Sequence, residues 1–145
     1  MHHATANLGL PYLYPGQSQK EFTFNEAMAR LDILIDPNIE GERPDPPDAP
    51  LAGQRWLIAG GATGAFLNHE RELASWDGEQ WTFIVPRPEM LLFDRSESRF
   101  LRYRAGEWLG LGAPASPSGG AVIDVEARQT LEQILSCLKT FGIFS

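Results

Sequence analysis

Large aromatic side chains in the middle of the chain are the residues best suited to contact a ligand. Trp56 lies in an apolar run, and four further rings flank glycine-containing turns: Trp76, Trp81, Tyr103 and Trp108. Flat rings with a polar edge stack on sugars when they are exposed, and fill the core of a thin sheet when they are buried. We expect most of them to be core, and keep the four turn-flanking rings as candidates for a glycan-binding surface.

The residue types used in catalysis are present, but not in a catalytic pattern. His69 lies in a polar loop, and Cys137, the only cysteine, falls in a helical pattern that predicts a buried thiol. The carboxylates fall mainly at predicted turns, where turn chemistry and solubility explain them. The sequence lacks a nucleophile elbow, a phosphate-binding loop and a paired-cysteine metal motif. We therefore expect that the protein is not an enzyme and has no catalytic residues, no metal and no cofactor. A small hydrolase is kept as an alternative behind the two functions given below, because the fold, and not the spacing in the sequence, brings the two carboxylates of such a site together.

Length and charge limit the classes of protein further. A chain of 145 residues fits one domain with an appended arm. The net charge of −7 disfavours binding to nucleic-acid phosphates. No apolar run approaches the roughly 20 residues that span a bilayer, and no signal peptide is evident, so we expect synthesis in the cytoplasm and no membrane insertion.

The N-terminal segment, residues 1–38, is predicted to be an extended arm followed by a helix. Prolines and glycines keep the apolar arm extended, so it packs either on its own domain or on a neighbouring subunit. Thr23 and Glu26 predict a capping box at the helix start, and Asp36-Pro37 predicts its end. The apolar positions at helical spacing are expected to face the core or a subunit interface: Phe24, Ala27, Met28, Leu31, Leu34 and Ile35.

Residues 39–53, centred on a run of four prolines among Asp and Ala, predict a stiff linker. Residues 54–112 then show short strands with turn signals between them, which predicts a small antiparallel meander or barrel. A weak internal repeat is visible, because Trp76 to Trp81 resembles Tyr103 to Trp108. Each copy predicts a hairpin whose aromatic side chains flank the turn.

A second, flexible linker over 113–121 precedes a C-terminal helix over 122–145. Asp124 predicts its N-cap and Gly142 its C-cap. Apolar residues recur at heptad spacing between them: Ala127, Leu131, Ile134, Leu138 and Phe141. This stripe predicts either docking on the chain's own domain or packing around a symmetry axis with copies of itself. The complete prediction is an α+β fold with an N-terminal arm and helix, a small β domain and a C-terminal amphipathic helix.

One stretch is more specific than its local structure requires. Four polar residues there are needed neither by the cap nor by the apolar face of the first helix: Gln17, Gln19, Lys20 and Asn25. Glu26, the predicted capping residue, lies among them and completes the candidate set. This excess predicts an attachment surface. The wider run Leu8–Asp32 resembles the start of a phage protein family, the domain of unknown function 2793, and the likeness extends to about residue 110. The sequence departs from that family at Phe66-Leu67-Asn68, where the family pattern has tryptophan and glycine.

The resemblance implies a structural component of a tailed-phage or gene-transfer-agent virion, such as a head spike, a fibre or a tail-associated protein. It implies other virion proteins as partners and a location in the virion after synthesis in the host cytoplasm. Such proteins are often homotrimers, which agrees with the heptad stripe. The alternative function is a carbohydrate-binding module that recognises a host surface polysaccharide through exposed tryptophans.

Overall fold

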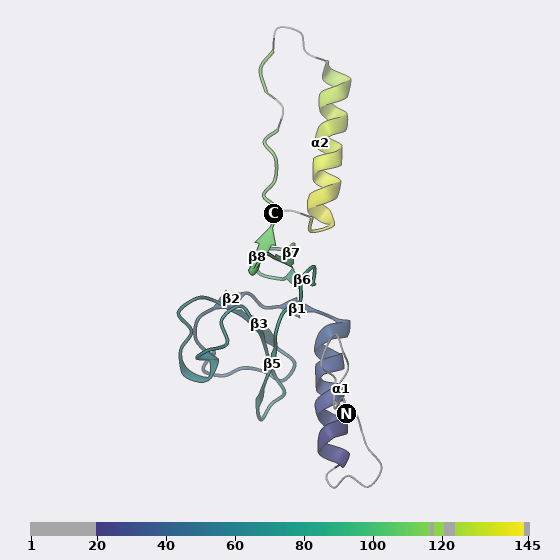
Figure 1. Cartoon of the computed structure of the whole chain (residues 1–145). Helices are drawn as coiled ribbons and strands as arrows, with labels where there is room; N and C mark the ends of the chain where they lie inside the picture. The colour runs from purple at the N-terminus through teal and green to yellow at the C-terminus, as the bar shows by residue number, and fades with distance from the viewer. Residues whose placement is uncertain (1–19, 117, 121–123, 144–145) are drawn as a thin grey trace.

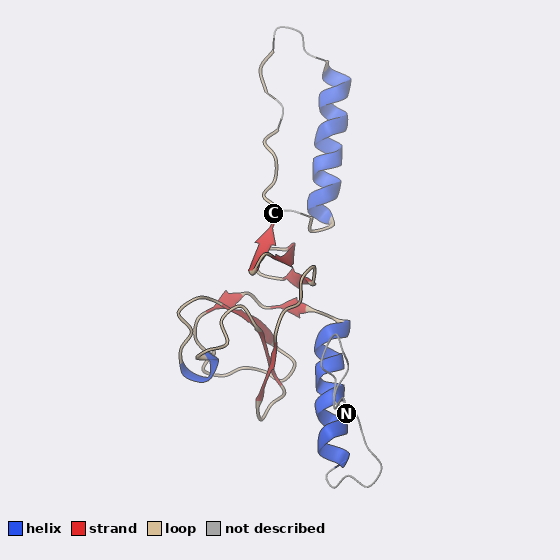
Figure 2. Cartoon of the chain, in the orientation of Figure 1, coloured by secondary structure: helices blue, strands red, loops and turns tan. Residues whose placement is uncertain are grey.

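The computed structural model describes residues 20–116, 118–120 and 124–143. It contains two long helices, a short 3-10 helix and eight strands (Figures 1 and 2). The helices are α1 (Lys20–Ile35), η1 (Gly64–Phe66) and α2 (Val125–Thr140). The strands are β1 (Asn38–Ile39), β2 (Glu42–Arg43), β3 (Arg55–Ile58), β4 (Leu73–Trp76), β5 (Trp81–Ile84), β6 (Leu91–Asp94), β7 (Arg99–Arg104) and β8 (Glu107–Gly110).

The strands form two sheets of four, and the two sheets have the same topology. The first has the order β2-β3-β4-β5 and the second has the order β1-β6-β7-β8. In each, a two-residue strand pairs in parallel with the first strand of a three-stranded antiparallel meander. The α+β class is confirmed, and each sheet contains an antiparallel meander as predicted, but the sheets are mixed and open, so they form no barrel.

The parallel pairings also change the interpretation of the proline-rich segment. Residues 39–53 are not a linker throughout, because β1 and β2 add one strand to each sheet before the prolines begin. Further along, the amide of Thr63 donates to the carbonyl oxygen of Pro44 at 2.9 Å. The segment thus joins the two sheets to each other rather than spacing two units apart.

The main core lies between the two sheets and the C-terminal half of α1. The side chains buried in it are Ile33, Ile39, Leu57, Leu73, Ile84, Leu92 and Leu101. A smaller core covers the opposite face of the first sheet. There Phe66, held by η1 in the connection between β3 and β4, packs with Ile58 and Ala74. The first sheet is therefore covered on both faces.

The first helix differs from its prediction at its start and on its face. It already includes Lys20, so Thr23 lies within the helix and Glu26 pairs with Arg30 at 3.0 Å instead of closing a capping box. Phe24, Met28 and Ile35 are exposed in the described chain, so a core role for them is wrong. The residue of α1 that is buried in the main core is Ile33, and Leu34 packs against that core beside it.

A buried arginine fixes that end of α1. Arg55, on β3, is only 7% exposed. Its guanidinium donates to the carbonyl oxygen of Asp36 at 2.7 Å and to the carboxylate of Asp32 at 3.2 Å. A buried charge is tolerated because it is paired and hydrogen-bonded in this way.

Both predicted hairpins are confirmed, with different turns. Trp76 pairs with Trp81 across β4 and β5, and the loop between them is organised by Asp77. Tyr103, one position before the end of β7, pairs with Trp108, one position after the start of β8. That second turn is tighter, because Ala105 and Gly106 both adopt positive φ angles (53° and 88°), as a two-residue type I′ turn requires.

Candidate assembly surface

Helix α2 exposes the predicted heptad stripe. Asp124 accepts a hydrogen bond from the amide of Ala127 at 2.8 Å, so the predicted N-cap is confirmed. No side chain of Val125–Thr140 is buried in the described chain. Leu131, Ile134 and Phe141 are 48%, 49% and 73% exposed. Of the other stripe positions, Ala127 is exposed and Leu138 is half-buried. In Figure 1, α2 extends away from the two sheets, so it does not dock its stripe on them.

Only the C-terminal end of α2 is anchored to the second sheet. Gly142, with φ +70°, ends the helix as predicted. Its amide donates to the carbonyl oxygen of Lys139, and the amide of Ile143 donates to the carbonyl oxygen of Leu138. The carbonyl oxygen of Gly142 accepts from the amide of Phe100 on β7 at 2.6 Å. A Cβ at Gly142 would lie 2.7 Å from the ring of Phe93, so only glycine fits this junction. We call this junction the foot of α2.

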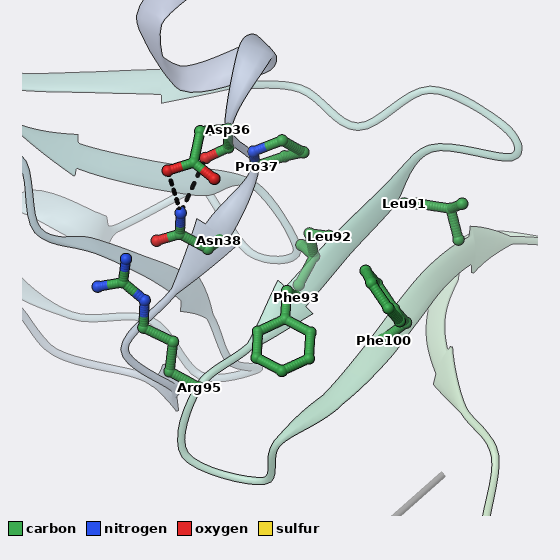
Figure 3. A pocket seen from close by; sticks show the side chains of 8 residues that line it. All are labelled: Asp36, Pro37, Asn38, Leu91, Leu92, Phe93, Arg95 and Phe100. Carbon is green, nitrogen blue, oxygen red and sulfur yellow. Dashed lines mark hydrogen bonds between the residues drawn. The ribbon is translucent and has the colours of Figure 1, made fainter. Parts of the chain in front are cut away.

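A hollow of about 410 Å³ lies beside the foot, where β1 meets β6 (Figure 3). The polar side chains at its rim already bond to neighbouring groups. Asn38 donates from its amide to the carboxylate of Asp36 at 2.6 Å, and Arg95 donates to Glu40 at 2.8 Å. Its apolar side holds Phe93 and Phe100 in an edge-to-face contact 5.1 Å between ring centres. This arrangement offers an apolar contact surface rather than groups for proton transfer.

The candidate glycan-binding rings form two separate pairs rather than one row. Trp76 and Trp81 are 5.0 Å apart on the first sheet, and Tyr103 and Trp108 are 5.2 Å apart on the second. Strands β5 and β8 lie well apart in Figure 1. The indole of Trp108 also donates to the carbonyl oxygen of Arg71 at 2.9 Å, and its ring packs against the main core. Trp56, which is buried, confirms the expected core role for one of the tryptophans.

The predicted attachment residues are only partly described. Gln17 and Gln19 lie outside the described residues. Lys20 and Asn25 are exposed on α1, whereas Glu26 is half-buried and paired with Arg30. At about 100° of rotation per residue, positions 20, 25 and 26 project from different sides of the helix. The structure thus leaves Lys20 and Asn25 available without gathering the set on one face.

Several sequence interpretations change at the level of single side chains. Cys137 is exposed, so the buried thiol is wrong: its position on α2 faces no described element. His69 stacks on Phe83 with ring centres 3.8 Å apart and bonds to Glu72 at 2.8 Å, a structural role beside the smaller core. Phe66, where the sequence departs from the family pattern, is fully buried, and no local pattern in the sequence indicated this burial.

Among the described ionisable side chains, Asp77 and Arg71 have shifted pKa values, and both shifts come from contacts with hairpin residues. Hydrogen bonds from the backbone of Gln80 and Glu79 lower the pKa of Asp77. A hydrogen bond and the charge of Glu107 raise the pKa of Arg71. Among the residues that the structure describes, no three His, Cys, Asp or Glu side chains are close enough to hold a metal ion. None of the described helices has the length and apolar character to cross a membrane.

Comparisons with known proteins give one match. No curated protein and no solved structure is significantly similar to this chain. A family model described as protein of unknown function DUF2793 matches residues 24–109, which run from the first turns of α1 to β8 and exclude α2. This match covers more than half of the sequence, and the chain therefore belongs to the DUF2793 family.

Proposed function

We propose that this protein is a non-enzymatic structural subunit of a tailed-phage or gene-transfer-agent particle, such as a head spike, a fibre or a tail-associated protein. Its N-terminal segment attaches it to other virion proteins, and α2 joins copies into a homotrimer. The location in a virion rests on the resemblance of Leu8–Asp32 to phage proteins. The assembly role rests on the geometry of the described chain.

The observation that carries the proposal is the exposed stripe of α2. Leu131, Ile134 and Phe141 leave about half or more of their surface in water, although each is a residue that folding normally buries. Contiguous exposed apolar surface on a protein marks an interaction site. A capped helix with a regular apolar stripe supports assembly with other helices rather than a role within one chain.

The residue types in the stripe also favour more than two copies. Spacings of four and three residues place Leu131 and Leu138 at a positions, and Ala127, Ile134 and Phe141 at d positions. In parallel coiled coils, Leu at a with Ile at d shifts the preference from dimers to trimers and tetramers. This pattern supports an assembly of more than two copies, of which the proposed homotrimer is one.

The attachment role is tested with exposed residues of α1. Lys20→Ala with Asn25→Ala is expected to reduce incorporation into particles, measured by quantitative mass spectrometry of purified particles, while the circular dichroism spectrum stays unchanged. Arg87→Ala, which also removes an exposed polar side chain, is the matched control and is expected to incorporate normally. Unchanged incorporation of the double variant would contradict attachment through this surface, and absence of the wild-type protein from particles would contradict the virion role.

Carbohydrate binding is a second candidate, and one cleft favours it. A hollow of about 460 Å³ between α1 and the β4–β5 hairpin is lined in part by Trp76, Asp77 and Asp32. Aromatic and carboxylate groups together are suited to a sugar ring and its hydroxyls. Host polysaccharide is expected to change tryptophan fluorescence in the wild type, and Trp76→Ala to abolish the change. An unchanged signal across a panel of neutral, amino and acidic glycans would contradict this candidate.

A further inference from the structure

The second sheet buries one face and exposes the other. Leu92 on β6 and Leu101 on β7 lie in the main core. Side chains alternate between the two faces of a strand, so their neighbours Leu91 and Phe100 project from the opposite side. Leu109 on β8 joins that side, because both it and Leu91 pair with Arg102. We call the surface formed by Leu91, Phe100, Leu109 and Leu111 the outer face; its leucines are 53%, 52% and 63% exposed.

The equivalent face of the first sheet is covered, which shows what the second sheet lacks. Between β3 and β4 the chain makes a long connection, residues 59–72, that carries η1 and places Phe66 in the smaller core. The corresponding connection between β6 and β7 is the tight turn 95–98. With the same strand topology, the second sheet has no covering segment of its own among the described residues.

The outer face continues into the foot of α2. A groove of about 390 Å³ on this face is lined by Leu91, Phe100, Leu109 and Leu111 together with Ile143, the residue after the helix cap. Ile143 follows Gly142, whose carbonyl is bonded to β7, and Phe141 at the end of the stripe precedes it. The groove on the outer face therefore reaches the foot of α2, two residues beyond Phe141 at the end of the stripe.

We propose that a second copy of this chain covers the outer face, within the same assembly that joins the α2 helices. This inference rests on the proposed self-association through α2. The stripe spans about two heptads, and helices this short are marginal without further packing, so a stable assembly needs additional buried area. Packing α2 side by side in a parallel bundle brings the feet of neighbouring copies together, and the outer faces with them.

The charges at the edge of the outer face are mostly paired within the chain. Arg102 and Arg104 both pair with Glu89. Each copy carries a net charge of −7, so overall charge opposes association, and the affinity has to come from the apolar side chains of the outer face.

The test compares two exposed leucines on opposite sides of the molecule. Leu109→Glu places a charge on the outer face, and Leu67→Glu places the same charge on the covering connection of the first sheet, where leucine is 57% exposed. Sedimentation equilibrium of the full chain measures the association constant. Leu109→Glu is expected to weaken association at least tenfold, and Leu67→Glu to leave it unchanged. Denaturant unfolding and circular dichroism confirm that both variants fold.

Failure of this inference and failure of the proposed assembly give different results. If Ile134→Glu produces monomers while Leu109→Glu associates like the wild type, the outer face is not between copies, and assembly through α2 stands. If the wild-type chain stays monomeric at all concentrations reached, both are overturned. The inference is also overturned if the amides of β8 exchange hydrogen as fast in the oligomer as in the monomer.

Discussion

The two sheets share a topology but differ in what covers them. Sheet β2-β3-β4-β5 has the main core on one face and Phe66 with its neighbours on the other. Sheet β1-β6-β7-β8 contributes Leu92 and Leu101 to the same main core, and among the described residues its outer face is reached only by the foot of α2 and stays largely exposed. The first sheet thus has apolar packing on both faces within one chain, whereas the second leaves one apolar face available for the contact proposed above.

This difference follows from two connection lengths rather than from the strands. Residues 59–72 supply a cover for the first sheet, whereas residues 95–98 supply only a turn. The aromatic hairpin pair is present in both sheets, yet Trp81 packs with Phe66 in the smaller core while Trp108 packs against the main core. Strands of the same topology therefore have different packing partners, because the connections between them differ in length.

The largest expected effect is at the cover of the first sheet. Phe66→Ala removes a fully buried ring and leaves a cavity, which is expected to lower the free energy of unfolding by about 3–5 kcal/mol. Guanidinium denaturation followed by tryptophan fluorescence measures this loss. A loss below that of an exposed leucine substitution would show that the connection does not cover the sheet.

The second effect is at the foot of α2. Gly142→Ala introduces a Cβ 2.7 Å from the ring of Phe93 at a φ of +70°, and a left-handed non-glycine residue alone costs roughly 1–2 kcal/mol. We expect faster hydrogen exchange at the amide of Phe100, which donates to Gly142, while amides within β3 and β4 keep their protection. Unchanged exchange at Phe100 would contradict the anchoring of α2 at this point.

A smaller effect on stability is expected at the outer face of the second sheet. Phe100→Ala removes a ring that is 41% exposed, so in the monomeric Ile134→Glu background the free energy of unfolding should fall by about 1 kcal/mol or less. The same substitution in the associating chain is expected to weaken association. A loss in the monomer as large as that of Phe66→Ala would remove the contrast between the two sheets.

The smallest effect is at the turn of the first hairpin and depends on pH. Because the pKa of Asp77 is lower in the folded chain than its ordinary value of 3.8, its charge stabilises the fold above that pH. This contribution is lost as the pH falls through the folded pKa. The stability difference between the wild type and Asp77→Asn, measured by denaturation, should therefore shrink below about pH 4 and stay constant above pH 5. A difference that grows on acidification would contradict this assignment.

Local patterns in the sequence predicted local structure well. Asp124 and Gly142 marked the ends of α2, and the two aromatic hairpins were evident from their turns, because caps and turns depend on a few neighbouring residues. The predicted helix start at Thr23 was wrong. The helix already includes Lys20, so Thr23 lies inside it and cannot cap its first turn. Heptad spacing likewise identified the stripe that α2 exposes.

Long-range pairing was beyond local pattern. The strands β1 and β2 are only two residues long, so no periodicity reveals them, and their parallel partners lie far along the chain. The burial of Phe66 depends on a connection that folds back over a sheet. The exposure of Leu91 and Leu109 was equally hidden, since a run such as Leu91-Leu92-Phe93 is apolar on both faces and does not say which face is covered.

The single cysteine gives the most direct test of assembly through α2. Cys137 is exposed on that helix and is the only thiol in the sequence, so a spin label attached there reports on α2 alone. Pulsed electron paramagnetic resonance is expected to show dipolar coupling between copies at one short distance, lost on dilution with unlabelled chain or in Ile134→Glu. Folded, labelled protein without inter-copy coupling at high concentration would contradict the claim that α2 joins copies of this chain.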